Sequence, residues 1–391
     1  MRFQLAPARI LAALGALAVV AIVVAGCGGG SDSTSSGGGS TGTSTGGGEE
    51  SSSSALFPKA AKANEEFETR PTSIGIETPV EKSIPKGKVI DFIQCAVPAC
   101  ATEREIFEEA TDVLGWKLKS INAGSTPEEI KAAYQQAIND KPDAVLGSGN
   151  PKVLFEPEVK QLDKLGIPVV EAFVEEEAGG GVTAVIGGIG TSEFQGKMMA
   201  DYILANLEDE EAEVGVVNVK GFETVTATAE KVEEVIGEEC SGCTTKRLDA
   251  PVTSIGSDLP QRISSFFTSN PGIDWATVGY NDMVTGLPTA LKGAGVEDVK
   301  LTTVNINTSI APYLANGEYL QGTMGTSFPE VYWRVIDFLV RQFNGESTKE
   351  QEDDSTLPYW TITKETLPTT DEEFPVVTDY QEQFKKLWGV E

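Results

Sequence analysis

From Lys88 onward, short apolar runs alternate with amphipathic helical segments, and this alternation limits the possible folds more than any other feature. The runs are short and mostly apolar, as strands buried on both faces of a sheet are. Residues 103–114 place Ile106, Phe107 and Ala110 on one face of a helix. A second helix begins at Thr126 with a Pro in its first turn. The strands expected in this half lie at residues 89–93, 116–121, 144–146, 167–173 and 184–186.

The same alternation restarts after Gly190. Helices are expected at residues 192–207, 224–236, 259–268, 284–292, 310–315 and 329–343, and strands at 213–219, 244–248, 276–280, 300–304 and 321–325. Consecutive β/α sets form parallel sheets covered by helices on both faces. The sequence therefore predicts an α/β protein with two doubly wound parallel-sheet lobes. Ligands bind at the carboxyl ends of such strands, so we expect the site in the cleft between the lobes.

The lobes are expected to exchange segments, which makes the hinge a multi-segment one. We assign residues 88–190 plus 326–345 to the N-terminal lobe and residues 191–325 plus 346–391 to the C-terminal lobe. Crossovers are expected near residues 190–191, 325–326 and 344–346, and a final helix near residues 380–388 is expected on the C-terminal lobe. Residues 55–87 form a lead segment to which the sequence assigns no role.

The N-terminus has the pattern of an export signal. Arg2 and Arg9 precede a 16-residue apolar run at residues 10–25, shorter than the roughly 20 residues that span a bilayer. The run ends in Val-Ala-Gly-Cys27, which resembles the lipobox of bacterial lipoproteins. Residues 1–26 are thus interpreted as a lipoprotein signal peptide and Cys27 as the lipidated residue. The alternative is an uncleaved anchor helix with an incidental cysteine.

Residues 28–54 support the lipoprotein interpretation. They are Gly, Ser and Thr except for Asp32, Glu49 and Glu50, so they have no apolar surface to bury and we expect a disordered linker. The protein is therefore expected outside the cytoplasm, attached to a bacterial membrane through its lipid, and monomeric.

Charge and residue counts exclude several functions. The formal charge is −29, opposite to the cationic surface that binds nucleic acid. The chain contains no His, which excludes Ser-His-Asp catalysis and every His-ligated metal site. Gly188-Ile189-Gly190 is followed by Glu193 where a dinucleotide-binding loop has its third Gly. A carboxylate-pair glycoside hydrolase is the enzyme class left open. We expect no enzyme, no cofactor and no metal.

The remaining cysteines form two close pairs, Cys95/Cys100 and Cys240/Cys243. An even number of cysteines in an exported chain predicts disulfides. Two alternatives compete with that interpretation. The Cys-Ser-Gly-Cys sequence at 240–243 matches a redox motif, although it follows a helix instead of opening one. A four-cysteine zinc site would require the two pairs to converge in space.

Four sequence segments, taken in order, resemble a known family. They are Leu-Gly-Ile-Pro-Val-Val at 165–170, Gly196-Lys197 with Asp-Tyr-Ile at 201–203, Tyr-Asn-Asp-Met at 280–283, and Gly-Thr-Met at 322–324. Over residues 88–343 the chain resembles the type I periplasmic binding proteins of the ribose/galactose branch. The resemblance implies capture of a sugar or sugar-like ligand by hinge closure and delivery to an ABC transporter permease.

The family's ligand positions map onto this chain one by one, with gaps. The resemblance implies ligand contacts from Ser148, Asn150, Phe173, Thr191, Phe222, Glu223, Asn281, Asp282, Asn307 and Thr326. Sugar binders of this branch usually place an Asp followed by Arg where this chain has Phe173 and Val174, and the C-lobe arginine is also missing. The two Phe residues also fit ordinary core packing, and Asn281-Asp282 also fits a turn or helix cap.

Two other functions share this fold. A ligand-sensing co-receptor would report to a signalling protein instead of a permease. A binding protein for an amino acid or signalling compound would use the same hinge, but the sequence places no obvious Arg for an α-carboxylate.

Overall fold

The computed structural model describes residues 55–95, 99–124 and 126–390. The signal peptide, Cys27 and the linker predicted at residues 27–54 lie outside the described residues.

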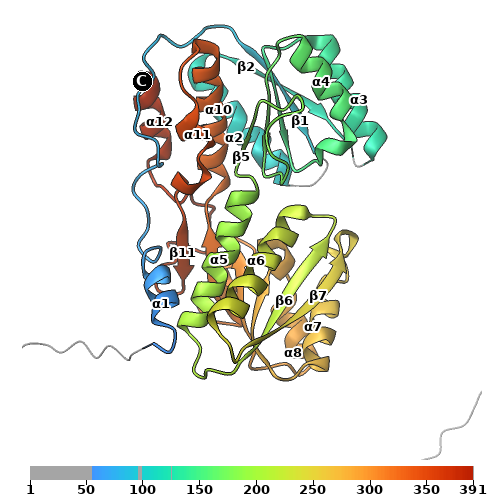
Figure 1. Ribbon diagram of the computed structural model, residues 1–391, viewed down its shortest axis with the longest axis vertical. Helices are drawn as coiled ribbons and strands as arrows, with labels where there is room; N and C mark the ends of the chain where they lie inside the picture. Colours follow the sequence, from blue (N-terminus) through green and yellow to red (C-terminus); the bar gives the residue numbers. More distant parts are fainter. Residues whose placement is uncertain (1–54, 96–98, 125, 391) are drawn as a thin grey trace, which may run out of the picture. The chain divides into compact units, whose positions relative to one another are not determined.

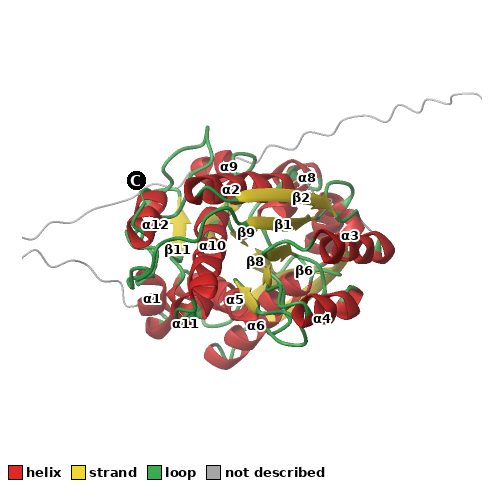
Figure 2. Cartoon of the chain, turned by 90° about the horizontal axis from the view of Figure 1, so that it is seen from above, coloured by secondary structure: helices red, strands yellow, loops and turns green. Residues whose placement is uncertain are grey.

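The N-lobe is built on a sheet with strand order β2-β1-β3-β4-β5, in which every neighbouring pair is parallel. Figures 1 and 2 show α3 and α4 on one side of β1 and α2 and α10 on the other. The strands are β1 (Val89–Gln94), β2 (Lys117–Asn122), β3 (Ala144–Ser148), β4 (Val169–Ala172) and β5 (Ala184–Ile186). The helices are α2 (Ala99–Leu114), α3 (Pro127–Asp140), η1 (Lys152–Leu154) and α4 (Glu156–Lys164).

Alternating side chains along β1 supply the two faces of this lobe, as the period of two in a strand requires. Phe92 belongs to the apolar cluster that also contains Phe107 of α2, whereas Ile93 belongs to the cluster with Ile130 of α3. The capping sequence acts as expected, because the Thr126 side chain accepts the N–H of Glu129 at the start of α3.

The C-lobe sheet has strand order β11-β10-β9-β8-β6-β7 and is parallel except for β11, which runs antiparallel to β10. Helices α5 and α6 lie on one side of β6, and α7 and α8 lie on the other (Figure 1). The strands are β6 (Glu213–Lys220), β7 (Thr244–Pro251), β8 (Ile273–Val278), β9 (Lys300–Val304), β10 (Leu320–Gly325) and β11 (Trp360–Thr363). The helices are α5 (Ile189–Ala205), α6 (Glu223–Glu239), η2 (Val252–Ser254), α7 (Leu259–Ser269), η3 (Asn281–Val284), α8 (Leu287–Gly293) and α9 (Ala311–Asn316). The prediction of two α/β lobes with mostly parallel sheets is confirmed.

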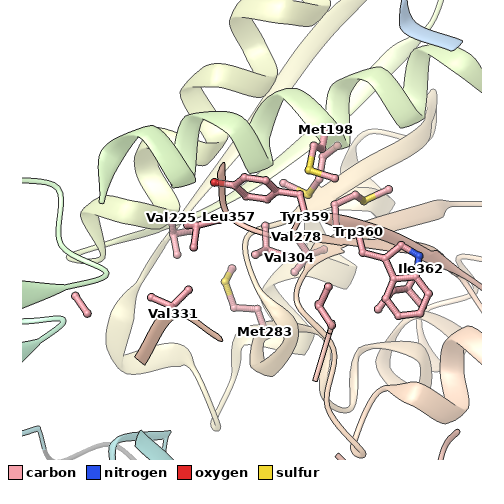
Figure 3. Packing of buried hydrophobic residues seen from close by; sticks show 14 of the residues in the cluster. Met198, Val225, Val278, Met283, Val304, Val331, Leu357, Tyr359, Trp360 and Ile362 are labelled. Carbon is pink, nitrogen blue, oxygen red and sulfur yellow. The ribbon is translucent and has the colours of Figure 1, made fainter. Parts of the chain in front are cut away.

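The third crossover between the lobes lies later in the chain than the sequence indicated. After α10 (Phe328–Asn344), the short helices α11 (Lys349–Glu352) and η4 (Asp354–Thr356) stay with the N-lobe, where α11 contacts β5. The chain then reaches the C-lobe core, where Tyr359, Trp360 and Ile362 are buried near Val278 (Figure 3). The crossover expected near residues 344–346 therefore lies about a dozen residues later, between η4 and β11.

Hydrogen bonds join this later crossover to the first one. The Asp354 carboxylate accepts the N–H groups of Gly187 and Gly188, at 2.8 and 2.9 Å, just before α5 begins. The Tyr359 hydroxyl donates to Thr191 Oγ1 at 3.3 Å. The segments that connect the lobes are thus bonded to each other.

The last helix, α12 (Tyr380–Trp388), does not pack on the C-lobe as expected. The Trp388 indole stacks on Trp333 of α10, with ring centroids 5.4 Å apart. Its N–H also donates to Asp337 Oδ1 at 2.7 Å. Because α10 packs on α2, this pair of tryptophans holds the end of the chain on the N-lobe side.

The lead segment is attached to both lobes. It contains α1 (Pro58–Glu65), which packs on α5. The Phe67 carbonyl accepts the N–H of Thr361 in β11 at 2.8 Å. Further along, Trp116 of the N-lobe donates its indole N–H to the Pro85 carbonyl at 2.7 Å.

Both predicted disulfides are present, Cys95–Cys100 and Cys240–Cys243, with Cα atoms 5.6 and 5.3 Å apart. The four sulfurs are therefore paired within each short loop, and no group of metal-ligating side chains occurs among the described residues.

Candidate functional site

The loop after β3 brings two predicted ligand residues together in the N-lobe. Ser148 and Asn150 are both buried, and Asn150 Nδ2 donates to the Ser148 carbonyl at 3.3 Å. The Ser148 hydroxyl lies 3.5 Å from the hydroxyl of Tyr332 on α10. The loop after β3 therefore packs against α10, the helix that follows the second crossover.

A buried acid that the sequence analysis missed completes this cluster. Glu103 of α2 is 6% exposed, and its carboxylate accepts hydrogen bonds from the Tyr332 and Ser148 hydroxyls. Burial raises the pKa of Glu103 to about 7. Its Oε2 has no hydrogen-bond partner among the described residues. The signal for it was available, because Glu103 lies one helical turn before Phe107 on the apolar face of α2.

Phe173, directly after β4, has the left-handed backbone φ of +53° that non-Gly residues seldom adopt. Its half-buried ring makes edge contacts with Phe328 and Tyr332, at centroid distances of 5.1 and 5.6 Å. Phe173 therefore packs partly against the core, as the alternative interpretation expected, but its side chain is only half-buried. Strained backbone of this kind clusters at active sites, ligand clamps and switch regions.

In the C-lobe, three predicted residues form one hydrogen-bonded group at the ends of β8 and β9. Asn307 Nδ2 donates to Asp282 Oδ1 at 3.0 Å. Asn281 Oδ1 accepts the N–H of Asp282 at 2.8 Å, as a turn-forming Asn does. Burial raises the pKa of Asp282, whereas the bond from Asn307 lowers it. The bond that the Asn281 side chain makes among the described residues thus uses its oxygen and not its amide nitrogen.

The start of α6 places two more predicted residues on the C-lobe. Phe222 precedes the helix, and its ring lies 6.1 Å from that of Tyr280 in an edge contact. Glu223, the first residue of the helix, is exposed. Glu175 follows β4 in the N-lobe, and its carboxylate lies near the backbone of Ala227 in α6, although its Oε1 has no hydrogen-bond partner among the described residues. Burial, and then the charge of Glu223, raise the pKa of Glu175 to about 7. The two lobes therefore meet through Glu175.

Thr191 and Thr326 lie at the crossovers and differ in what they offer a ligand. Both are buried, but Thr191 is bonded to Tyr359. The Thr326 hydroxyl has no hydrogen-bond partner among the described residues, and neither has Oδ1 of Asn305, which follows β9. Thr326 and Asn305 thus present free acceptors at the carboxyl ends of neighbouring strands.

Two surface hollows lie away from all of these residues. One of about 490 Å³ is lined by α7 and β7, and another of about 240 Å³ lies between the lead segment and the α10–α11 turn. Neither is lined by a predicted ligand residue.

A sequence model of the periplasmic binding protein domain matches residues 98–347. The chain belongs to the periplasmic binding protein domain family. The fold resemblance drawn from the sequence is therefore confirmed, and the family is one of transport binding proteins. A search of curated proteins finds no match.

Solved structures of the type I periplasmic binding fold superpose on this chain. A solute-binding protein of an ABC transporter from Burkholderia graminis, in complex with D-arabinose, has a TM-score of 0.61 at 15% identity, covering 76% of this chain and 100% of that one. An ABC sugar transporter subunit from Rhodobacter sphaeroides has a TM-score of 0.60 at 16% identity, covering 72% and 99%. A solute-binding protein from Bacillus halodurans with bound myo-inositol has a TM-score of 0.58 at 17% identity, covering 78% and 100%. At these identities the likeness establishes the fold.

Within the part of the chain that the structure describes, no helix is long and apolar enough to cross a membrane.

Proposed function

We propose that this periplasmic binding protein captures a sugar or polyol outside the cytoplasm and delivers it to an ABC transporter permease. The observation that carries the proposal is the family match over residues 98–347, which spans the strand ends of both lobes. The structures described with D-arabinose and myo-inositol bound support a ligand rich in hydroxyl groups. They also favour transport over a sensing role.

The chemistry of the strand ends fits such a ligand. Glu103 Oε2, Asn305 Oδ1 and Thr326 Oγ1 are buried acceptors with no partner among the described residues. Leaving a buried acceptor unpaired costs about 1–3 kcal/mol, so a ligand that donates to them gains that energy. Sugar hydroxyls are donors, and the half-buried Phe173 ring offers an apolar surface for the opposite face of a sugar ring.

Hinge closure follows from where these groups lie. The N-lobe carries the proposed ligand residues Ser148, Asn150 and Phe173. The C-lobe carries Phe222, Glu223, Asn281, Asp282 and Asn307. A ligand that bonds both sets binds the closed form more tightly and shifts the population toward it. The crossovers that carry Thr191 and Thr326 are the segments about which the lobes rotate.

We further propose that the protein is a lipid-anchored monomer, attached to the membrane through Cys27. Cys27→Ser should then prevent labelling of the protein by a palmitate analogue in cells. Equal labelling of the variant and the wild type would contradict the anchor.

Thermal-shift screening of the soluble domain, starting at Ala55, tests the ligand class. The panel contains pentoses, hexoses, inositols and amino acids. A ligand present at 100 times its dissociation constant adds about 2.7 kcal/mol of stability, which raises the melting temperature visibly. We expect a shift with at least one sugar or polyol. A shift with amino acids alone would contradict the proposal.

A further inference from the structure

The segment after β11, residues 364–379, lies beyond the family match, which ends at residue 347. It is fixed at its far end by buried and half-buried groups. Glu330 of α10 accepts the N–H of Val377 at 2.6 Å. The Arg70 guanidinium donates to the carbonyls of Pro375 and Val376, at 2.7 and 2.8 Å. The segment is therefore a docked part of the fold.

Just before these anchors, Glu373 reaches a loop of the C-lobe. Its Oε1 accepts the backbone N–H of Thr308 at 2.9 Å and the Thr308 hydroxyl at 3.1 Å. Thr308 lies between β9 and α9, in the loop that also carries Asn307. One carboxylate thus holds both the backbone and the side chain of this loop.

The bonds continue from Thr308 to the predicted ligand residues. Asn307 Oδ1 accepts the N–H groups of Ser309 and Ile310, at 3.1 and 3.2 Å, which orients the amide. Its Nδ2 then donates to Asp282, the neighbour of Asn281. The loops after β8 and β9 are therefore joined in one network, and Glu373 is attached at its outer end.

We propose that Glu373 is a positioning residue that sets the geometry of the C-lobe half of the ligand site, from a segment outside the family match. This inference rests on the proposed function. Holding the β9–α9 loop in its bonded form before a ligand arrives removes an ordering cost that the ligand would otherwise have to overcome. Losing Glu373 leaves the loop free to sample other conformations, so that less of the protein is ready to bind.

The test compares Glu373→Ala and Glu373→Gln with the control Glu372→Ala, the adjacent exposed acid. Calorimetry uses the sugar or polyol that stabilises the wild type. Glu373→Ala should weaken binding about three- to tenfold, the usual worth of one or two partly exposed hydrogen bonds. Glu373→Gln keeps an acceptor oxygen and should recover part of the affinity. Glu372→Ala should bind as the wild type does.

Three further measurements separate positioning from general stability. Amide exchange in residues 305–310 should become faster in Glu373→Ala, with an unchanged melting temperature because Glu330 and Arg70 still dock the segment. The charge of Glu373 also raises the pKa of Asp282, after burial. Glu373→Gln should therefore move the acid limb of the affinity profile to lower pH.

The possible failures are distinguishable. A wild type that binds no member of the panel overturns the proposed function, and with it this inference. A wild type that binds while Glu373→Ala binds equally tightly overturns this inference alone. Slower or unchanged amide exchange in residues 305–310 of Glu373→Ala would also contradict it.

Discussion

Glu171 is a fully buried acid in the middle of β4. Replacing it by Gln tests how much the ionisation of a buried carboxyl group lowers the stability of the folded protein. The Tyr134 hydroxyl donates to its Oε1 at 2.6 Å, while Oε2 has no partner among the described residues. Tyr134 itself stacks on Phe155, with centroids 3.8 Å apart. Glu171 is in no ion pair among the described residues, and the charge of Lys152 lowers its pKa by less than burial raises it. The carboxyl group is therefore expected to keep its proton in the folded protein.

The magnitude follows from the shifted pKa. Burial, with a smaller contribution from the charge of Glu176, raises the pKa of Glu171 from 4.5 to about 8, against the opposing hydrogen bond from Tyr134. A carboxyl with a raised folded-state pKa contributes stability that is fully present below pH 4.5 and is lost as pH rises through 8. One pKa unit corresponds to about 1.4 kcal/mol, so the wild type should lose about 3 kcal/mol between pH 5 and pH 8 through this group.

Glu171→Gln is neutral at both pH values and lacks this loss. Denaturant unfolding of both proteins at pH 5 and pH 8 gives the difference in unfolding free energy at each pH. That difference should move in favour of the variant by about 3 kcal/mol as pH rises. Any pH-independent change in stability caused by the Gln amide is the same at pH 5 and at pH 8, so it cancels when the two differences are compared. Glu109→Gln, at an exposed site on α2, should show no such change. An equal difference at pH 5 and pH 8 for Glu171→Gln would refute the reasoning.

Two further predictions concern the site and the disulfides. Asn281→Ala should lower ligand affinity about 5- to 150-fold, measured by calorimetry, because a buried polar group of the ligand loses its hydrogen-bond partner. The control Asn316→Ala, at the exposed end of α9, should leave the affinity unchanged. Equal affinity of the two variants would show that Asn281 is not part of the site. The double variant Cys240→Ser/Cys243→Ser should lose about 2 kcal/mol of unfolding free energy, because a disulfide that closes so short a loop lowers the chain entropy of the unfolded state by about that amount. Unchanged stability would contradict a disulfide in the native protein.

Local sequence patterns predicted the elements of the fold well. The strand expected at residues 300–304 is β9, and the capping sequence at Thr126 opens α3. Both depend on neighbouring residues. The last helix was placed on the wrong lobe because its position depends on Trp388 meeting Trp333 and Asp337 of α10, a contact between residues 51 or more apart in sequence.

The difference between local patterns and contacts between residues far apart in the sequence also explains which parts of the candidate site could be predicted. The resemblance to the family named the proposed ligand residues, and their place near strand ends could be predicted because parallel strands present their carboxyl ends at one edge of a sheet. The contact of Glu373 with Thr308 spans 65 residues and has no local pattern that would reveal it. Glu103 could have been found, since an acid on the apolar face of a helix requires a buried partner.

Closure on a ligand is the central claim, and small-angle X-ray scattering measures it directly. The soluble domain is compared without ligand and at saturation with the sugar or polyol identified by thermal shift. Ligand contacts from both lobes favour the closed form, so the radius of gyration should fall on saturation. An unchanged radius of gyration at a saturating concentration, with binding verified by calorimetry, would contradict the account.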